Sequence, residues 1–223
     1  MCGRFSQAQI AELDREVFRL LELPALEPRY NIAPTQEVAV VRERRNGERV
    51  LQLLRWGLIP SWAKDPAIGN RMINARAETL AAKPAFKRPF ARQRCIVPAD
   101  GFYEWKRTEG TKQPYYIRRE DGGSMAFAGL WDRWRSDSDA TVDSFTIVTT
   151  TPNDLVASIH NRMPAILLPD GYDMWLDPEN HDVDDLSSLL GPYPAEDMRA
   201  YPVSRFVNNP RNEGPECVSP ANG

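Results

Sequence analysis

Short β-rich segments follow one another closely along this chain, and their spacing limits the folds it can adopt. Five lie between residues 94 and 151, separated by turn signals such as TEGTK and EDGG. Two earlier segments flank Asn46-Gly47, a dipeptide typical of a type I′ hairpin turn. The chain also has 19 prolines against 13 glycines, and together these features exclude an all-helical bundle. The pattern predicts a largely antiparallel sheet that folds on itself.

Helices are expected to be few and short. Ser6 and Gln9 form a capping-box pattern ahead of apolar residues at helical spacing, which predicts a helix over about 7–22. This helix would hold residues 1–5 against the body of the protein. Further along, the sequence predicts a helix over 152–159 capped by Thr151, a strand at RMPAILL, a helix over 183–190, and a loose tail after Val207.

The distribution of charge is more informative than its total. The net charge of −3 by itself argues against a nucleic-acid-binding protein. Yet residues 71–95 carry seven basic residues and one acid, whereas residues 170–200 carry nine acids and one basic residue, Arg199. One face could therefore bind phosphate while another faces solvent.

The sequence also bears on location and cofactors. It contains no apolar run near the roughly 18 residues of a membrane span, and residues 1–7 lack the apolar core of a secretory signal. Cysteines at 2, 95 and 217 are too few and too distant for a disulfide framework or a CxxC zinc site. We therefore expect a single-domain cytosolic protein with no metal, no other cofactor and no membrane partner.

Unusual chemistry is expected at the N-terminus. Because cysteine is small, Met1 should be removed, which leaves an α-amino group and a thiol on Cys2. Their reference pKa values of about 8 and about 8.5 give both groups a reactive fraction near neutral pH. The amine would condense with an aldehyde to an imine, and the thiolate would then close a thiazolidine ring. Taken alone, a cysteine in second place is more often a chance residue.

Polar residues in the basic stretch suit an oxygen-rich ligand. Asn74, Arg76 and Glu78 alternate just after RMI, so they would share one face of a strand. An asparagine amide beside a guanidinium suits a sugar phosphate, because arginine binds phosphate through two nitrogens. A solvated strand edge would show the same pattern.

Proton-transfer groups are expected further along. Glu104 lies between two aromatic residues in a strand, and desolvation there would raise its carboxyl pKa toward neutrality. His160 stands two residues before Arg162, which pairs a proton carrier with a phosphate-binding side chain. Trp62 and Trp105 lie near basic residues, where exposed aromatic rings could stack on single-stranded nucleic acid.

Six motifs in matching order closely resemble the SRAP family, the SOS-response-associated peptidases. They are MCGRF, YNIAPT, WGLIPSW, INARAET, CIVPADGFYEWK and IHNRMPAIL, and the similarity extends to about residue 208. The resemblance implies a single α+β domain over 1–208 with an antiparallel, β-barrel-like core and peripheral helices, followed by the tail 209–223. It also implies that the protein senses abasic sites in single-stranded DNA and links itself to the sugar aldehyde through the N-terminal cysteine.

The resemblance assigns roles residue by residue. It makes Cys2 the nucleophile, Asn74 the residue that orients it, and Glu104 and His160 the proton-transfer groups. Asn161 departs from the pattern, because many relatives have an acid there. The residues implied to bind DNA are Arg76 and Arg162 as phosphate clamps and Arg4, Asn31, Pro34, Trp62 and Trp105 as the lining of the groove.

Two other functions remain open at this stage. The family name indicates a thiol peptidase that at least removes its own first residue and could act in trans. The third possibility is a protein that binds single-stranded DNA without a covalent link. In each case a monomer is expected.

Overall fold

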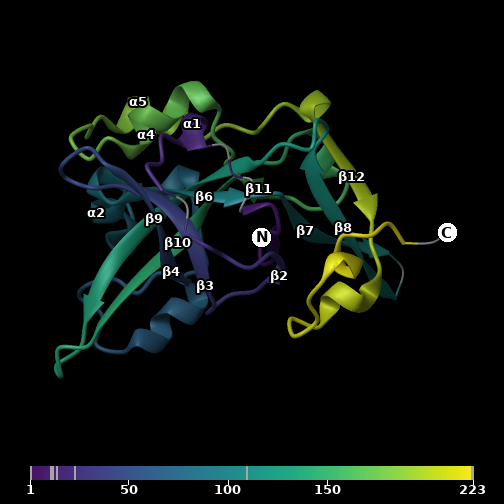
Figure 1. Cartoon of the computed structure of the whole chain (residues 1–223), viewed down its shortest axis with the longest axis horizontal. Helices are drawn as coiled ribbons and strands as arrows, with labels where there is room; N and C mark the ends of the chain where they lie inside the picture. Colours follow the sequence, from purple (N-terminus) through teal and green to yellow (C-terminus); the bar gives the residue numbers. More distant parts are fainter. Residues whose placement is uncertain (1, 11–12, 14, 23, 109, 222–223) are drawn as a thin grey trace.

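The computed structural model describes residues 2–10, 13, 15–22, 24–108 and 110–221, and Figure 1 shows the arrangement. Two sheets meet near the first residues of the chain, and the helices lie along the outside of the larger one. Within the described ranges, none of the helices has the length and apolar character needed to cross a bilayer.

The larger sheet closes into a barrel of five strands. These are β3 (Glu37–Glu43), β4 (Arg49–Trp56), β6 (Arg94–Ala99), β9 (Met125–Arg135) and β10 (Thr141–Thr150). They pair in the order β10-β4-β3-β6-β9, and β9 pairs back with β10 to complete the circle. Each pair is antiparallel except β10 with β4, which run parallel.

Both faces of the barrel wall are buried, because alternate residues of each strand point to opposite sides. On β3, Val38 and Val40 join the cluster inside the barrel, while Ala39 and Val41 join the cluster under the helices. This explains why β3 reads as an unbroken apolar run instead of an alternating one.

A second sheet of five strands packs against one side of the barrel. Its order is β12 (Met198–Pro202), β8 (Thr111–Arg119), β7 (Gly101–Thr108), β1 (Phe5–Gln7) and β2 (Arg29–Ile32). The Phe5 ring on β1 lies 5.0 Å from the Trp56 ring in the barrel, so β1 connects the two sheets.

Two short strands pair with β10 near its C-terminal end. β5 (Asn74–Arg76) pairs parallel with it, and β11 (Met163–Pro164) pairs antiparallel. The remaining elements are the α-helices α1 (Arg15–Phe18), α2 (Pro84–Arg92), α3 (Asp154–Ala157), α4 (Tyr172–Leu176) and α5 (Val183–Ser188) and the 3₁₀ helices η2 (Pro66–Arg71), η3 (Ala77–Thr79), η4 (Pro169–Gly171), η5 (Ala195–Asp197), η6 (Arg205–Asn208) and η7 (Pro215–Cys217).

The predicted fold class is confirmed: a single α+β domain with a β-barrel core and peripheral helices. The hairpin of β3 and β4 is also confirmed, but its type I′ turn is wrong. Gly47 has a φ of 81°, whereas Asn46 does not have the positive φ that a type I′ turn requires there. Hydrogen bonds from Gly47 N to Arg44 O and from Arg44 N to Glu48 O show a three-residue loop with a glycine bulge.

The helix predicted over 7–22 is wrong. Residues 5–7 form β1, and Ser6 Oγ lies 2.7 Å from the Tyr116 hydroxyl instead of capping a helix. Only residues 15–18 are α-helical, and Arg19 ends that turn with a φ of 51°. Residues 11, 12 and 14 of the predicted span lie outside the described residues. The apolar spacing reflects burial of Ile10, Leu13, Phe18 and Leu20 in the outer cluster.

Two further local predictions need correction. The helix predicted over 152–159 spans only 154–157, and Asn153, not Thr151, accepts the capping hydrogen bond. RMPAILL forms a strand over only two residues, 163–164. The helix over 183–190 is confirmed within two residues of its end, whereas the sequence did not predict α2.

The C-terminal segment (209–221), expected to be loose, is packed against the second sheet. Asn31 Nδ2 donates to the Asn212 carbonyl at 2.8 Å, and Cys217 is fully buried. The composition misled the prediction because buried side-chain amides here supply partners for the turn-rich backbone. Residues 222 and 223 lie outside the described residues.

Candidate active site

Cys2 lies where the start of the chain passes between the two sheets. β1 and β7 are antiparallel, and Tyr103 N donates to Arg4 O at 2.9 Å, so the residues ahead of β1 run alongside Glu104. Asn74, on β5, donates from Nδ2 to the Cys2 carbonyl at 2.8 Å. Elements far apart in the sequence thus fix the Cys2 backbone from two sides.

The Cys2 side chain is fully buried in the cluster that fills the barrel. Burial, and next the neighbouring charge of Glu104, raises the pKa of the thiol far above its usual range. In the full chain the Cys2 nitrogen belongs to a peptide bond with Met1 and is no amine. Removal of Met1 is therefore needed to create the amine and thiol pair.

Glu104 and His160, the two residues predicted to transfer protons, lie close together. Glu104 is 3% exposed, and burial raises the pKa of its carboxyl group, which the nearby His160 partly opposes. Glu104 Oε1 lies 3.8 Å from His160 Nδ1. The carboxyl group can therefore hold a proton at a higher pH than an exposed glutamate.

The turn after α3 fixes the imidazole ring of His160. Its Nδ1 lies 3.1 Å from Arg162 N and 3.2 Å from Arg162 O. A neutral Nδ1 accepts a hydrogen bond from the amide, and a protonated one donates to the carbonyl oxygen. Both protonation states therefore have a partner in the same turn.

The Arg162 guanidinium is held by a carboxylate in this structure. Its Nη1 and Nη2 donate to Glu78 at 2.5 and 3.0 Å, and Nη2 donates to the Thr149 carbonyl at 2.5 Å. The hydrogen bond from Arg162 lowers the pKa of Glu78. A phosphate that binds Arg162 must therefore compete with Glu78 or share the guanidinium with it.

Arg76 stands beside this pair because β5 and β10 are in parallel register, with Arg76 opposite Thr149. Its side chain is exposed, and within the described part of the chain its guanidinium makes no hydrogen bond or ion pair. Arg76 can therefore bind a phosphate directly.

Arg4 and Asn31 are committed to contacts within the protein. Arg4 Nη1 donates to Asn31 Oδ1 at 2.7 Å and to the Val207 carbonyl at 2.8 Å, and its guanidinium lies 5.8 Å from the Trp105 ring. Trp105 Nε1 donates to Asn208 Oδ1 at 2.8 Å. These contacts join the second sheet to η6.

Pro34 and Trp62 lie on separate loops. Pro34 is half-buried beside Thr35, whose φ is 76° and whose amide donates to the Trp56 carbonyl. Trp62 has 60% of its surface exposed, which is unusual for so large an apolar side chain.

One protein family, described as SOS response associated peptidase (SRAP), matches residues 1–210. The chain belongs to the SRAP family. Abasic site processing protein YoqW of Bacillus subtilis (strain 168) is similar to this SRAP chain, with 47% identity over 222 residues, 98% of this chain and 99% of that protein.

More distant relatives extend the comparison. Abasic site processing protein HMCES of Gallus gallus is 36% identical over 224 residues, which cover 86% of this chain and 66% of that protein. Crystal structures of a protein from Bacteroides thetaiotaomicron and one from Bordetella bronchiseptica superpose with TM-scores of 0.86 and 0.78, each at 30% identity. The alignments cover 99% and 91% of this chain and all of each crystallised chain.

Of the site residues predicted for this SRAP chain, the four assigned to catalysis lie together. Cys2, Asn74, Glu104 and His160 are linked by the contacts described above. Asn161 is exposed, and none of the contacts found in the described ranges involves its side chain. The roles of the site residues in catalysis and DNA binding stay predictions.

Sequence reasoning missed two features of the site. Glu78 was grouped with Asn74 and Arg76 but not paired with Arg162, which is 84 residues away. The Thr149 carbonyl was also missed, because a backbone acceptor has no signature in the sequence. The alternation of Glu78 with Arg76 was the one available signal.

Proposed function

We propose that this protein recognises abasic sites in single-stranded DNA and, once Met1 is removed, links itself to the lesion through a thiazolidine on Cys2. The convergence of Asn74, Glu104 and His160 on Cys2 carries this proposal. The names of YoqW and HMCES as abasic site processing proteins support it. We expect the protein to act as a monomer in the cytosol, where the adduct would shield the lesion from strand cleavage.

The first step forms an imine. The free Cys2 amine attacks the C1′ aldehyde of the open-chain sugar to give a carbinolamine, which loses one water molecule. Glu104, with its raised pKa, can donate the proton that lets the hydroxyl group leave. Asn74 holds the Cys2 carbonyl, and therefore the direction of the amine.

The second step closes the ring. The Cys2 sulfur bonds to the imine carbon, and the nitrogen takes the proton that the thiol gives up. Burial keeps the thiol protonated in the intact chain, so the group stays unreactive until needed. An α-ammonium group exposed by loss of Met1 would favour the thiolate.

Arg76 and Arg162 would hold phosphates next to the lesion. They project from β5 and from the turn before β11, on either side of the C-terminal end of β10. Trp62, Trp105 and Pro34 would contact bases or hold the strand open. Arg4 and Asn31 would support this groove through their contacts with the C-terminal segment.

A denaturing gel tests the proposal. Protein whose intact mass shows loss of Met1 should form an adduct with abasic single-stranded DNA that survives boiling, and Cys2→Ala should form none. Cys2→Ser should lose the stable ring but still form an imine that borohydride traps. A stable adduct in Cys2→Ala would refute the thiazolidine, and tight binding without any adduct would favour non-covalent recognition.

The runner-up is a thiol peptidase. The family description names a peptidase, and the same Glu104–His160 pair could move protons while Cys2 attacks the peptide bond to Met1. Self-processing of this kind is compatible with the main proposal, and so is a lyase activity that acts through the imine. Intact mass measured before and after incubation without any aminopeptidase distinguishes self-removal of Met1 from removal by another enzyme.

A further inference from the structure

A cleft of about 640 Å³ opens at the opposite end of the barrel from the site around Cys2. Two positions on strand β10 show how far the cleft lies from the site around Cys2. Arg162 in the site contacts the Thr149 carbonyl, whereas Arg133 in the cleft binds Asp143 at 2.6 and 2.7 Å. Six residues of extended strand separate Asp143 from Thr149, a distance of about 20 Å.

We call this feature the arginine cleft, because arginine dominates its lining. The tip of the β3–β4 hairpin, the C-terminal half of α2, strand β9 and the loop 178–181 form its walls. Six arginines face two glutamates, with Trp131 and His181 between them. The arginines are Arg42, Arg44, Arg45, Arg88, Arg92 and Arg133, and the glutamates are Glu43 and Glu179.

Some of these charges have structural partners. Arg133 is paired with Asp143, and Arg42 stacks over the Trp131 ring at 4.4 Å. Glu43 accepts from Arg49 outside the cleft at 3.2 Å, so its charge is already balanced. These paired groups have less charge available to attract a ligand than the unpaired arginines.

Arg88 lies 3.7 Å from Asp132, whereas two of the remaining arginines have no partner among the described residues. Arg45 and Arg92 are exposed, and no hydrogen bond or ion pair is found for either side chain in the part of the chain that the structure describes. Arg44 has one exposed contact, to Glu48 at 3.4 Å. A concave surface with several unneutralised guanidinium groups attracts anions strongly.

The arrangement favours a chain of phosphates over a single nucleotide. The arginines come from three separate elements and so can contact successive phosphates. Arg42 covers one face of Trp131, which removes the platform that a stacked base would need. Contacts of this kind read the backbone and not the base sequence.

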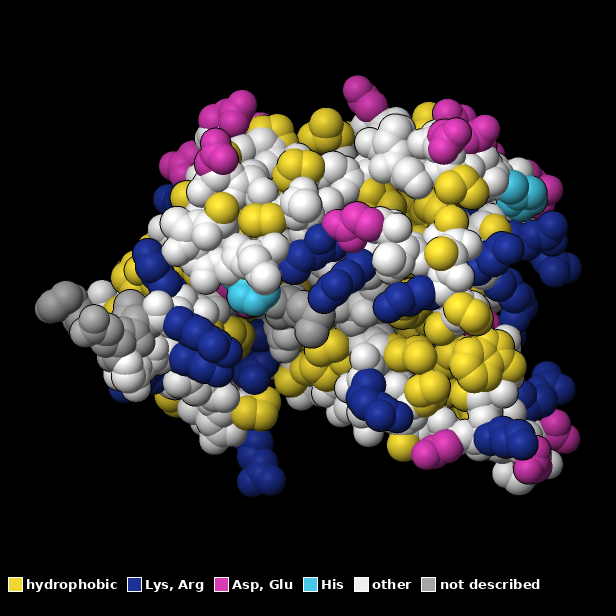
Figure 2. All heavy atoms as spheres, turned by 180° about the vertical axis from the view of Figure 1, so that it is seen from behind, with side chains coloured by type: hydrophobic (Ala, Val, Ile, Leu, Met, Phe, Trp, Pro, Cys, Tyr) yellow, Lys and Arg dark blue, Asp and Glu magenta, His cyan; other side chains and the backbone are white. Residues whose placement is uncertain are grey.

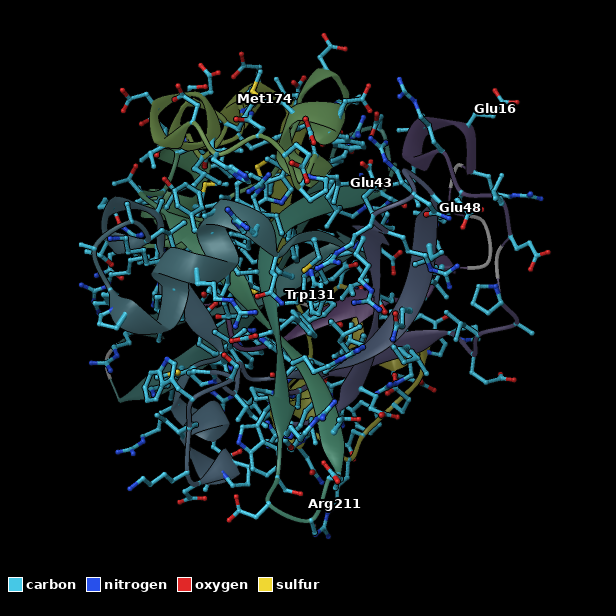
Figure 3. All side chains as sticks on the ribbon, turned by 90° about the vertical axis from the view of Figure 1, so that its left-hand side faces the viewer. Glu16, Glu43, Glu48, Trp131, Met174 and Arg211 are labelled. Carbon is cyan, nitrogen blue, oxygen red and sulfur yellow. The ribbon has the colours of Figure 1, made fainter. Side chains whose placement is uncertain are left out.

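Figures 2 and 3 show the face on which the cleft lies. Figure 3 shows Trp131 near the centre of the face at the left of Figure 1, with Glu43 nearby. In Figure 2, seen from behind, basic side chains run across the middle of the molecule toward its right-hand edge, which borders that same face.

We propose that the arginine cleft is a second DNA-binding site, which holds the sugar–phosphate backbone of the strand that flanks the lesion. The choice of DNA as the occupant rests on the proposed function, whereas the preference for phosphodiesters rests on the cleft alone. The cleft would add affinity that depends on strand length and not on the abasic site.

Binding to undamaged DNA tests this separately from crosslinking. Arg45→Glu/Arg92→Glu reverses two charges that have no partner to lose. Lys112→Glu/Arg199→Glu makes the same charge change at exposed positions on β8 and β12 and serves as the matched control. Fluorescence anisotropy with a labelled single strand of roughly 30 nucleotides, repeated over a range of salt, gives Kd and its salt dependence.

The cleft variant should bind the long strand at least about tenfold more weakly, and the slope of log Kd against log salt should fall by about 1.4, which corresponds to two lost phosphate contacts. The control should change neither. An abasic strand of roughly 3 nucleotides with the lesion in the middle, too short to span about 20 Å, should crosslink to both variants at the wild-type rate. Arg45→Gln/Arg92→Gln removes the same two charges without reversing them, and it replaces the glutamate variant if that protein does not fold. It should also weaken binding to the long strand.

Two results would overturn the proposal. One is an equal salt slope in the wild type and the cleft variant. The other is a changed oligomeric state on size-exclusion chromatography with unchanged DNA affinity, which would mean that the cleft binds an acidic surface of a second copy. Failure of the wild type to crosslink would instead refute the proposed function and leave the test of the cleft intact.

Discussion

The two ends of the barrel differ in the burial and pairing of their charged side chains. At the Cys2 end most of the charged groups are buried or paired: Glu104 is 3% exposed, and the Arg162 side chain, 14% exposed, is held by Glu78, whereas Arg76 is exposed. At the arginine cleft, Arg44, Arg45 and Arg92 are exposed to solvent. Desolvation shifts pKa values and supports proton transfer, whereas exposure supports only attraction that salt screens.

The largest difference between the two ends should come from Glu104→Gln. Removing the acid should slow crosslink formation by about 100-fold, a typical contribution of a general acid. The wild-type rate should fall as pH rises through the raised pKa of Glu104, because the proton donor is lost, and the variant should show a flat profile. Single-turnover rates from about pH 5 to about pH 8 measure this. The Arg45→Glu/Arg92→Glu variant should keep the wild-type profile on a short strand.

Glu104→Gln should also change stability in a pH-dependent way. Burial raises the folded-state pKa of Glu104, so its contribution to folding is full at low pH and is lost as pH rises through that pKa. The variant should therefore unfold at a higher temperature than the wild type at about pH 8 and at a similar one near pH 4. A difference of the opposite sign would mean that the buried carboxylate is stabilised as an anion.

His160→Ala should have a smaller effect, which is confined to reversal of the crosslink. The imidazole is partly exposed and lies 3.8 Å from Glu104, so it can pass a proton between solvent and the site when the ring reopens. Adduct should still form, but its release to excess competitor DNA should slow by about tenfold. Identical defects in formation and release, matching those of Glu104→Gln, would show that the two residues act as one unit.

Glu78→Gln should increase DNA affinity. It removes the carboxylate that competes with phosphate for Arg162, and because Glu78 is half-exposed the gain should be about two- to fivefold. The pKa of Glu78 is lowered, so this gain should persist at neutral pH and disappear as pH falls through that lowered pKa. Unchanged affinity at neutral pH would show that phosphate does not displace Glu78.

The smallest expected effect is that of Asn161→Asp. The side chain is exposed next to Arg162, so an added negative charge should weaken DNA binding by less than about twofold, and salt should erase the difference. Anisotropy at low and high salt checks this. A large loss of crosslinking would instead mean that residue 161 controls the orientation of His160.

The sequence predicted the barrel well because each core strand has a recognisable pattern of residues within its own short segment. β3 and β4 flank a turn dipeptide, and β9 and β10 are long apolar runs on either side of a polar loop. The helix over 7–22 failed because helical spacing and burial in an irregular segment look alike. β1 was missed for a related reason: three residues carry no period, and pairing with β2 and β7 decides their conformation.

The convergence of Cys2 with Asn74, Glu104 and His160 was anticipated through the family resemblance, since no local pattern relates residues so distant in sequence. The arginine cleft could not be foreseen. Its residues come from two separate basic stretches and from β9, and the net charge of −3 conceals them. Only the closure of the barrel brings them to one end.

The packing of the C-terminal segment decides where this protein can be shortened. The family match ends at residue 210, yet Asn31 also donates to the Asn212 carbonyl, and Cys217 is buried in a cluster beside the second sheet. A chain cut at the family boundary would remove one of the three carbonyl groups that accept from the buried Asn31 amide, and it would uncover the cluster in which Cys217 is buried. A purification tag added after Gly223 keeps this packing, whereas trimming to the family boundary would loosen the wall that supports the first residues of the chain.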